Sequence, residues 1–161
     1  TFCAATIGGH NVGVAPKTKL HAVKVLHGDI GSVKSLHVAF DRLLSKDLHS
    51  ASTIFSMSLT VGTKSSSGKV GYGAMGAMKA AFMHSCNRGV TVVGSAGNSG
   101  MQKNRFYVSR MPLNTGAIIV AATDRWDRQW SHNNLRADIY APGVDITSAW
   151  KDSDSSQKTM T

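Results

Sequence analysis

Residues 89–100 read Gly-Val-Thr-Val-Val-Gly-Ser-Ala-Gly-Asn-Ser-Gly, and this stretch decides the fold class. Its first part, residues 90–94, is a nearly all-apolar run with the length of one strand. Runs of this kind are typical of strands that are buried on both faces, as in parallel sheets. Residues 117–122 form a second run of the same kind. Together the two runs predict a buried sheet whose strands are mostly parallel.

Upstream of this stretch, predicted strands alternate with predicted helices. Residues 20–26 and 53–59 are short, apolar-rich segments that predict strands. In residues 35–44 the apolar side chains recur at helical spacing, which predicts an amphipathic helix. Residues 74–86 are rich in Ala and Met, also at helical spacing, and Gly89 fits the end of that helix. The order strand, helix, strand, helix, strand, strand predicts an α/β fold with a mostly parallel sheet.

Length and composition limit the organisation and the function. The chain has 161 residues, which suits a single domain over residues 1–161, with a loop at 64–71 and a loop or frayed tail at 151–161. No apolar run approaches the length of a membrane span. All 9 acidic residues are Asp, which excludes motifs built on Glu. The net charge of +9 is scattered along the chain, which favours a basic surface over a nucleic-acid site.

Histidines and small polar segments are the other candidates for chemistry. The 7 histidines form no i, i+4 pair, so a zinc site is not expected. Residues 28–32, 58–63 and 94–100 each follow a predicted strand, and ligands collect at the carboxyl ends of such strands. Asn98 could donate a hydrogen bond to an anionic oxygen there. The alternative is a tight turn that uses Gly and Asn for a positive φ angle.

Several blocks of the sequence carry a resemblance to a known family. They occur in the family's order and cover nearly the whole chain: residues 1–9, 13–16, 20–26, 56–59, 89–98, 120–124 and 138–150. Residues 1–9, Thr-Phe-Cys-Ala-Ala-Thr-Ile-Gly-Gly, resemble the stretch after the catalytic histidine of subtilisin-like serine proteases, most of all those of the fungal proteinase K branch. The resemblance implies a subtilisin-like three-layer sandwich with a mostly parallel central sheet, truncated at both ends.

The resemblance also implies a set of site residues. Asn98 is implied to be the oxyanion-hole donor, which hydrogen-bonds the charged oxygen formed when a peptide carbonyl is attacked. The implied substrate-binding residues flank an extended peptide and line the pocket for the residue before the cleaved bond: Gly31, Ser32, Ser58, Leu59, Thr60, Ala96 and Gly97. Small residues at these places agree with main-chain pairing of an extended substrate. Thr60 stands where the family has glycine, so we expect its side chain to crowd the cleft.

A calcium site and two free thiols are further implications. Asp138 falls at the position of a calcium-ligating carboxylate in proteinase K-like enzymes. Calcium prefers oxygen ligands, and the backbone carbonyls of Thr115 and Ala117 could complete the site. The alternative is an ordinary loop aspartate. Cys3 matches an unpaired cysteine of the family and Cys86 lies outside its disulfide positions, so both are predicted to be free, with a Cys3–Cys86 disulfide as the alternative.

The catalytic residues of the family do not occur here within their motifs. The mechanism needs a Ser-His-Asp triad, and the match begins at Thr1, inside a His-Gly-Thr motif, and stops at Thr161, before a Gly-Thr-Ser motif. We therefore expect the central fragment of a secreted, extracellular serine endopeptidase, inactive alone, whose parent acts on proteins or peptides and has a propeptide as a further partner. The alternative is a non-catalytic or degenerate subtilase-like protein with a peptide-binding or structural role. Neither nucleic acid nor a membrane is an expected partner.

Overall fold

The structure is a computed structural model of the chain. It describes every residue except 28–30, 46–51, 60–71, 99, 101–115 and 134–136. The contacts divide the chain into two compact units. The smaller unit comprises Thr1–Val23, Ala122–Trp130 and Ala141–Thr161, and the larger unit comprises Lys24–Ala121 and Ser131–Tyr140.

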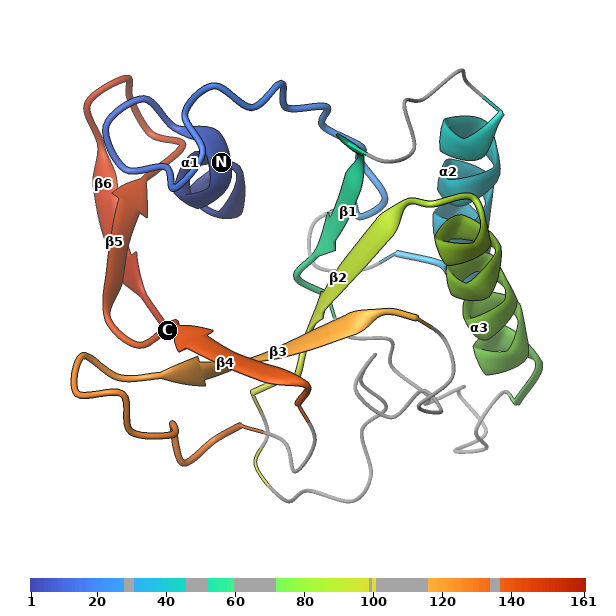
Figure 1. The fold of residues 1–161 in the computed structure, drawn as a ribbon. Helices are drawn as coiled ribbons and strands as arrows, with labels where there is room; N and C mark the ends of the chain where they lie inside the picture. Colours follow the sequence, from blue (N-terminus) through green and yellow to red (C-terminus); the bar gives the residue numbers. More distant parts are fainter. Residues whose placement is uncertain (28–30, 46–51, 60–71, 99, 101–115, 134–136) are drawn as a thin grey trace. The chain divides into compact units, whose positions relative to one another are not determined.

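A four-stranded sheet runs in the order β1-β2-β3-β4 (Figure 1). Strand β1 (Ile54–Met57) pairs in parallel with β2 (Thr91–Ser95), and β2 pairs in parallel with β3 (Ile118–Thr123). Strand β4 (Ile139–Pro142) lies next to β3. The predicted strands at 53–59, 90–94 and 117–122 are thus confirmed as β1, β2 and β3. The prediction of an α/β fold with a mostly parallel sheet is confirmed as well.

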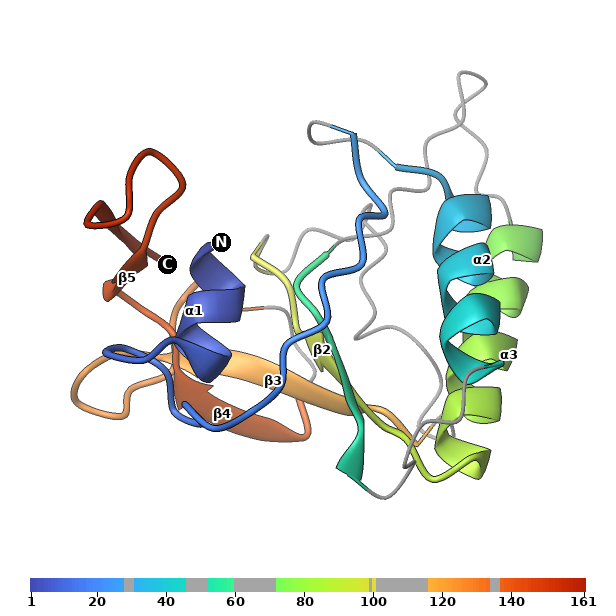
Figure 2. The ribbon, with the colours of Figure 1, turned by 90° about the horizontal axis from the view of Figure 1, so that it is seen from above.

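Two helices of the larger unit lie on the same side of β1 and β2 (Figure 2). They are α2 (Val33–Leu44) and α3 (Tyr72–Asn87), and both were predicted from their apolar spacing. Helix α3 ends at Asn87, and Gly89 follows it with φ of 80° while its N–H donates to the carbonyl of Cys86 at 2.9 Å. Glycine takes this left-handed conformation without steric cost, which explains its place at the helix end.

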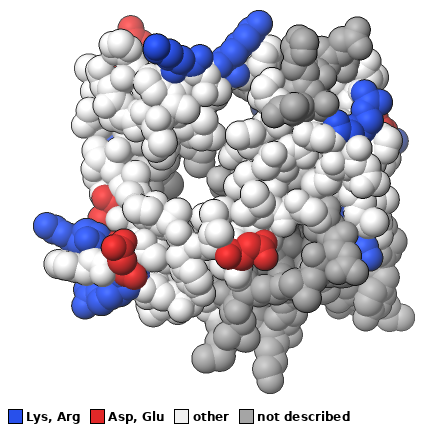
Figure 3. All heavy atoms as spheres, viewed as in Figure 1, with Lys and Arg blue, Asp and Glu red and all other residues white. Residues whose placement is uncertain are grey.

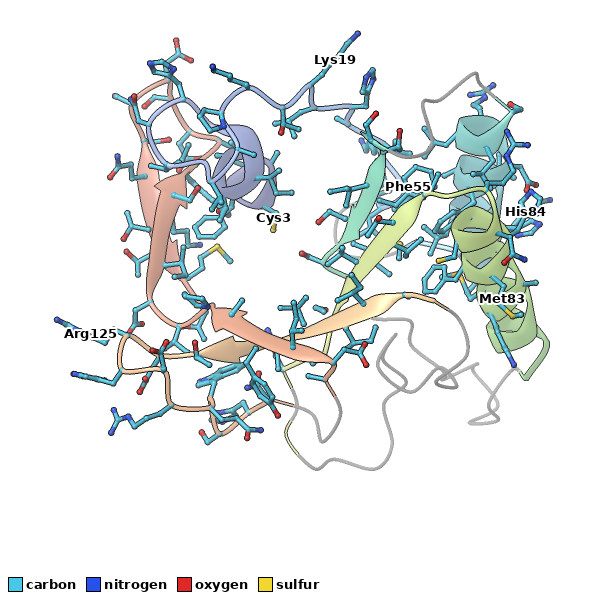
Figure 4. The ribbon with its side chains drawn as sticks, viewed as in Figure 1. Cys3, Lys19, Phe55, Met83, His84 and Arg125 are labelled. Carbon is cyan, nitrogen blue, oxygen red and sulfur yellow. The ribbon has the colours of Figure 1, made fainter. Side chains whose placement is uncertain are left out.

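The core of the larger unit lies between these helices and the sheet. Phe82 and Val92 have no exposed surface, and Met78 is 1% exposed. The ring of Phe40 packs against the rings of Phe55 and Phe82, with centroids 5.5 and 5.4 Å apart. Figure 4 shows Phe55 on the helix side of β1. This packing fixes how β1 and β2 lie side by side, and therefore where their carboxyl ends meet.

The smaller unit is built on a helix and a hairpin. Helix α1 (Phe2–Gly8) packs against β5 (Ile146–Ala149), which pairs in antiparallel fashion with β6 (Gln157–Met160). Thr6 Oγ1 donates to Ser148 Oγ at 3.2 Å, and Ser148 Oγ donates to the carbonyl of Phe2 at 3.3 Å. Since Ser148 has no exposed surface, these bonds pair hydroxyl groups that burial removes from water.

Two expectations from the sequence were wrong in their detail. Residues 20–26 form no strand in the structure, and Leu20, Val23 and Leu26 are 40–45% exposed. The tail, predicted as a loop or frayed end, has turns at first but forms β6 at residues 157–160. Both errors have one cause: a strand exists only where a second strand pairs with it, and local composition does not show pairing. The predicted loop at 64–71 lies outside the described residues.

In the part of the chain that is described, no helix combines the length and the apolarity needed to cross a bilayer. On the face drawn in Figure 3, the Lys and Arg side chains of the described residues stand in small separate groups and do not merge into one patch.

Candidate functional site

The carboxyl ends of β1 and β2 lie beside each other. Met57, the last residue of β1, is aligned with Gly94 in β2. The residues that follow β1 therefore leave the sheet next to Ser95 and Ala96. In the segment after β1, Ser58 is exposed, and Leu59 is half-buried against the core. Residues 28–32, 58–63 and 94–100 were predicted to converge at one edge of the sheet. The register is consistent with this for residues 58–59 and 94–98, whereas residues 28–30 and 60–63 lie outside the described residues.

The turn after β2 carries Asn98. Ala96 donates its N–H to the carbonyl of Val120 at 2.8 Å, so the turn starts as a continuation of the sheet. Gly97 has φ of 93° and Gly100 has φ of 59°, whereas Asn98 is not among the residues with positive φ. The alternative interpretation of the sequence was a tight turn in which Gly and Asn supply positive φ angles. In the structure the two glycines supply these angles and Asn98 does not. Asn98 is exposed, and its φ angle does not require an asparagine.

Ala96 and Gly97 contribute to this site through their backbone. Ala96 is 1% exposed and belongs to the core cluster, and Gly97 is buried too. The methyl group of Ala96 therefore faces the core and not a substrate. Their implied role in the pocket remains a prediction that concerns main-chain atoms. Thr60, expected to crowd the cleft, lies outside the described residues.

Gly31 and Ser32 have clear structural reasons for their identity. A Cβ atom at Gly31 would lie 2.5 Å from the carbonyl oxygen of Val25 and 2.6 Å from Leu26 Cδ2, so only glycine fits there. Ser32 caps α2, since its Oγ accepts the N–H of Ser35 at 2.9 Å. These contacts neither support nor oppose the implied role of the two residues in substrate binding, which remains a prediction.

Asp138 is tied to β3. Its Oδ2 accepts the N–H of Ile119 at 2.7 Å, and its own N–H donates to the carbonyl of Ile119 at 2.8 Å. The side chain bond occupies one of the two carboxylate oxygens of an exposed residue, so a cation could be held by the other oxygen. Thr115, one of the two expected carbonyl ligands, lies outside the described residues. Among the described residues, no three His, Cys, Asp or Glu side chains cluster as a metal site.

Both cysteines are free, as predicted. Cys3 is exposed on α1 (Figure 4). Cys86 is half-buried near the end of α3. Burial raises the pKa of the Cys86 thiol, and a backbone hydrogen bond with Val92 offsets part of this rise. Sequence reasoning did not foresee the contact of Cys86 with Gly116, where a Cβ would lie 3.1 Å from the sulfur. A long-range contact of this kind has no local sequence signal.

Parallel strands, helices on one side of them and an exposed asparagine turn at the strand ends define an α/β protein with a candidate site at one edge of its sheet. The family model of the subtilases matches residues 1–161. The chain belongs to the subtilase family, in its proteinase K-type branch.

Three curated relatives illustrate the similarity. The chain is 34% identical to subtilisin-like protease 2 of Pseudogymnoascus destructans over 99% of this chain and 37% of that protein. It is 36% identical to the extracellular serine proteinase of Thermus sp. over 99% of this chain and 36% of that protein. Proteinase R of Parengyodontium album is 33% identical over 93% of this chain and 37% of its own length. The chain thus spans little more than a third of the length of these relatives.

A solved structure supports the fold. The prenylagaramide maturation protease PagA superimposes with a TM-score of 0.72 over 100% of this chain and 57% of its own chain. Its sequence identity of 19% limits the comparison to the fold.

Proposed function

We propose that this chain forms the oxyanion-hole and substrate-binding part of a secreted, extracellular serine endopeptidase, which hydrolyses peptide bonds in proteins through a Ser-His-Asp triad. In that reaction a serine oxygen bonds to the peptide carbonyl carbon while a histidine takes the serine proton. The carbonyl oxygen becomes an oxyanion, and the amide of Asn98 donates a hydrogen bond to it. The C–N bond then breaks as the carbonyl re-forms, and the histidine gives the proton to the amine that leaves. A water molecule next gives a proton to the histidine and attacks the serine ester, and collapse of the second oxyanion releases the acid while the histidine returns the proton to the serine.

The observation that carries the proposal is the exposure of Asn98 and its place in the turn after β2. It is exposed at the carboxyl end of β2, beside the end of β1, in a turn whose positive φ angles belong to Gly97 and Gly100. A donor for an oxyanion has to be accessible and held by a rigid element. Membership of the subtilase family supports the same assignment.

Substrate and partners follow from the same proposal. An extended protein or peptide segment would lie between the residues after β1, Ser58 and Leu59, and the loop at Gly31 and Ser32. The pocket for the residue before the cleaved bond would use the backbone of Ala96 and Gly97. A propeptide would occupy the same cleft before activation, because it has to block an extended substrate.

The test uses the protein expressed from its complete gene and a fluorogenic peptide substrate. Removal of one oxyanion donor lowers kcat by about 10²–10³, so we expect this loss for Asn98→Ala with KM nearly unchanged. Asn11→Ala, at an exposed asparagine of the smaller unit, is the matched control and should keep the wild-type kcat. An unchanged kcat for Asn98→Ala contradicts the role of Asn98. A folded wild-type protein that binds peptides without cleaving them supports the non-catalytic alternative.

We also propose a structural calcium ion at Asp138. The second carboxylate oxygen of Asp138 and a backbone carbonyl, which the family resemblance implies at Ala117, are the ligand types that calcium prefers. A ligand that binds only the folded state raises its stability, so calcium should raise Tm relative to a chelator. Asp138→Asn should abolish this calcium-dependent shift, and Asp152→Asn, an exposed aspartate in the tail, should preserve it. Equal Tm values of the wild type with calcium and with the chelator contradict the site.

A further inference from the structure

The turn after β3, in the smaller unit, exposes a tryptophan ring together with two arginines. Trp126 is 65% exposed, which is unusual for so large an apolar ring. The guanidinium carbon of Arg125 lies 5.1 Å from the ring centroid, and that of Arg128 lies 4.6 Å from it, both within the range of cation–π attraction. Figure 4 shows the side chain of Arg125 extended away from β3. These three residues, called the Trp126 cluster below, form one exposed group.

The turn that carries the cluster is held in shape by Asp124. Its Oδ1 accepts the N–H groups of Trp126 at 2.9 Å and of Arg128 at 3.0 Å. Its Oδ2 accepts the Nε–H of Arg128 at 2.8 Å. The backbone closes the turn, since Asp124 donates its N–H to the carbonyl of Arg128 at 2.9 Å. Because the ring and Arg128 are already positioned, a partner that binds them has little conformational entropy to remove.

The two guanidinium groups keep donors for a partner. A guanidinium carries more N–H donors than one carboxylate uses. Arg128 gives its Nε–H to Asp124, and its side chain is still 69% exposed. Arg125 is exposed, and among the described residues no carboxylate forms an ion pair with it. The cluster can therefore accept further negatively charged groups.

The chemistry of the cluster fits an acidic segment of a protein. Guanidinium groups bind carboxylates in a bidentate way, and Trp and Arg are enriched among the residues that dominate protein–protein binding. A nucleic acid needs many phosphate contacts, whereas the basic side chains on the face drawn in Figure 3 stand in separate groups. Stable attachment to a membrane takes more apolar area or more basic residues than one ring and two arginines supply. The net charge of +9 favours the approach of an acidic partner.

We propose that the Trp126 cluster is a docking site for an acidic segment of a second protein. Carboxylates of the segment pair with Arg125 and Arg128, and the aliphatic carbons of its side chains lie against the ring of Trp126. The cluster contains none of the residues assigned to the oxyanion hole or to the cleft, so this inference goes beyond the proposed function and does not depend on it. The alternative is that the cluster only stabilises its own turn.

The experiment measures binding by fluorescence polarisation with the protein expressed from its complete gene, treated with a sulfonyl fluoride so that the peptide is not cleaved. The probe is a fluorescein-labelled peptide of alternating Glu and Gly, and the same peptide with Gln for Glu is the uncharged reference. Trp126→Ala and Arg125→Gln should each raise the Kd of the Glu peptide about fivefold or more, as for residues that dominate a contact. Lys19→Gln removes the same charge at an exposed position of the smaller unit and should leave Kd nearly unchanged.

Two aspartates separate a built site from a general effect of charge. Asp124→Asn removes the acceptor of the Arg128 Nε–H. Asp127→Asn removes the charge of an exposed aspartate that forms no ion pair with the described residues, and asparagine tolerates its φ of 59°. Both substitutions change the net charge by the same amount. Asp124→Asn should weaken binding although it makes the protein more basic, whereas Asp127→Asn should not. Tighter binding by both variants would show that net charge alone attracts the peptide, which overturns the proposal.

Three further outcomes would overturn it. Trp126→Ala that lowers Tm and leaves Kd unchanged would show that the cluster only stabilises its turn. A Glu peptide that binds no better than the Gln peptide would contradict a site for carboxylates. If the variants weaken binding to double-stranded DNA or to phosphatidylserine vesicles but not to the Glu peptide, the partner is not an acidic protein segment. Asn98→Ala should leave the Kd of the Glu peptide unchanged, so the fate of the proposed function is decided separately.

Discussion

Two glycines of the larger unit should respond in opposite ways to the same substitution. At Gly31, an alanine Cβ would meet the carbonyl oxygen of Val25 at 2.5 Å and Leu26 Cδ2 at 2.6 Å. The oxygen belongs to the backbone and cannot rotate away, so the loop itself would have to shift. Overpacking of this kind costs about 1–3 kcal/mol. We therefore expect Gly31→Ala to lower the free energy of unfolding by that amount.

Gly76 is the matched control, because it lies inside α3 with no atom within 4 Å of an added Cβ. There the substitution replaces the weakest common helix former except proline by the strongest, a gain of about 0.8–1 kcal/mol. Thermal unfolding followed by circular dichroism measures both variants. A change of 1 kcal/mol corresponds to a shift in Tm of about 2–4 °C at this size. If Gly31→Ala unfolds at or above the wild-type Tm while Gly76→Ala is stabilised, the packing around Gly31 described above is incorrect.

Two further predictions concern the thiols and a strained turn. At pH 8, iodoacetamide should label exposed Cys3 quickly and Cys86 slowly, because burial and a raised pKa reduce both access to the Cys86 thiol and its thiolate fraction. Mass spectrometry distinguishes the sites, and equal rates in the folded protein would contradict this prediction. Asp145 has φ of 54°. Asp145→Val should therefore cost about 1–2 kcal/mol in urea unfolding, while Asp145→Asn should be nearly neutral because asparagine tolerates this conformation. Equal effects of the two substitutions would argue against the left-handed conformation.

The sequence allowed the sheet and its helices to be predicted where the signal is local. Residues 90–94 and 117–122 are apolar because alternate residues of the strands they form are buried, and residues 35–44 show the spacing of one buried helix face. Residues 20–26 have a similar composition but form no strand. Strand β6 shows the reverse: its composition does not indicate a strand, because all four of its residues are exposed. It is a strand because its backbone pairs with that of β5.

In the candidate site, too, some features could be predicted from the sequence and others depend on long-range contacts. The position of Asn98 at a strand end follows from the order of elements, because parallel strands place their carboxyl ends at one edge. The bond between Asp138 and Ile119 could not be predicted, since it joins residues that are far apart in the chain. The tight approach of Gly31 to Val25 is of the same kind, because it depends on how a loop folds back on the segment before it.

In the turn after β2, each residue can be examined for a structural reason that explains its identity. Ala96 is small because it is 1% exposed in the core, where a larger side chain would displace its neighbours. Gly97 and Gly100 are glycines because their φ angles are 93° and 59°. None of these reasons applies to Asn98, which is exposed and outside the left-handed region. The absence of such a requirement agrees with the role that we propose for the amide of Asn98, and the kcat of Asn98→Ala tests that role directly.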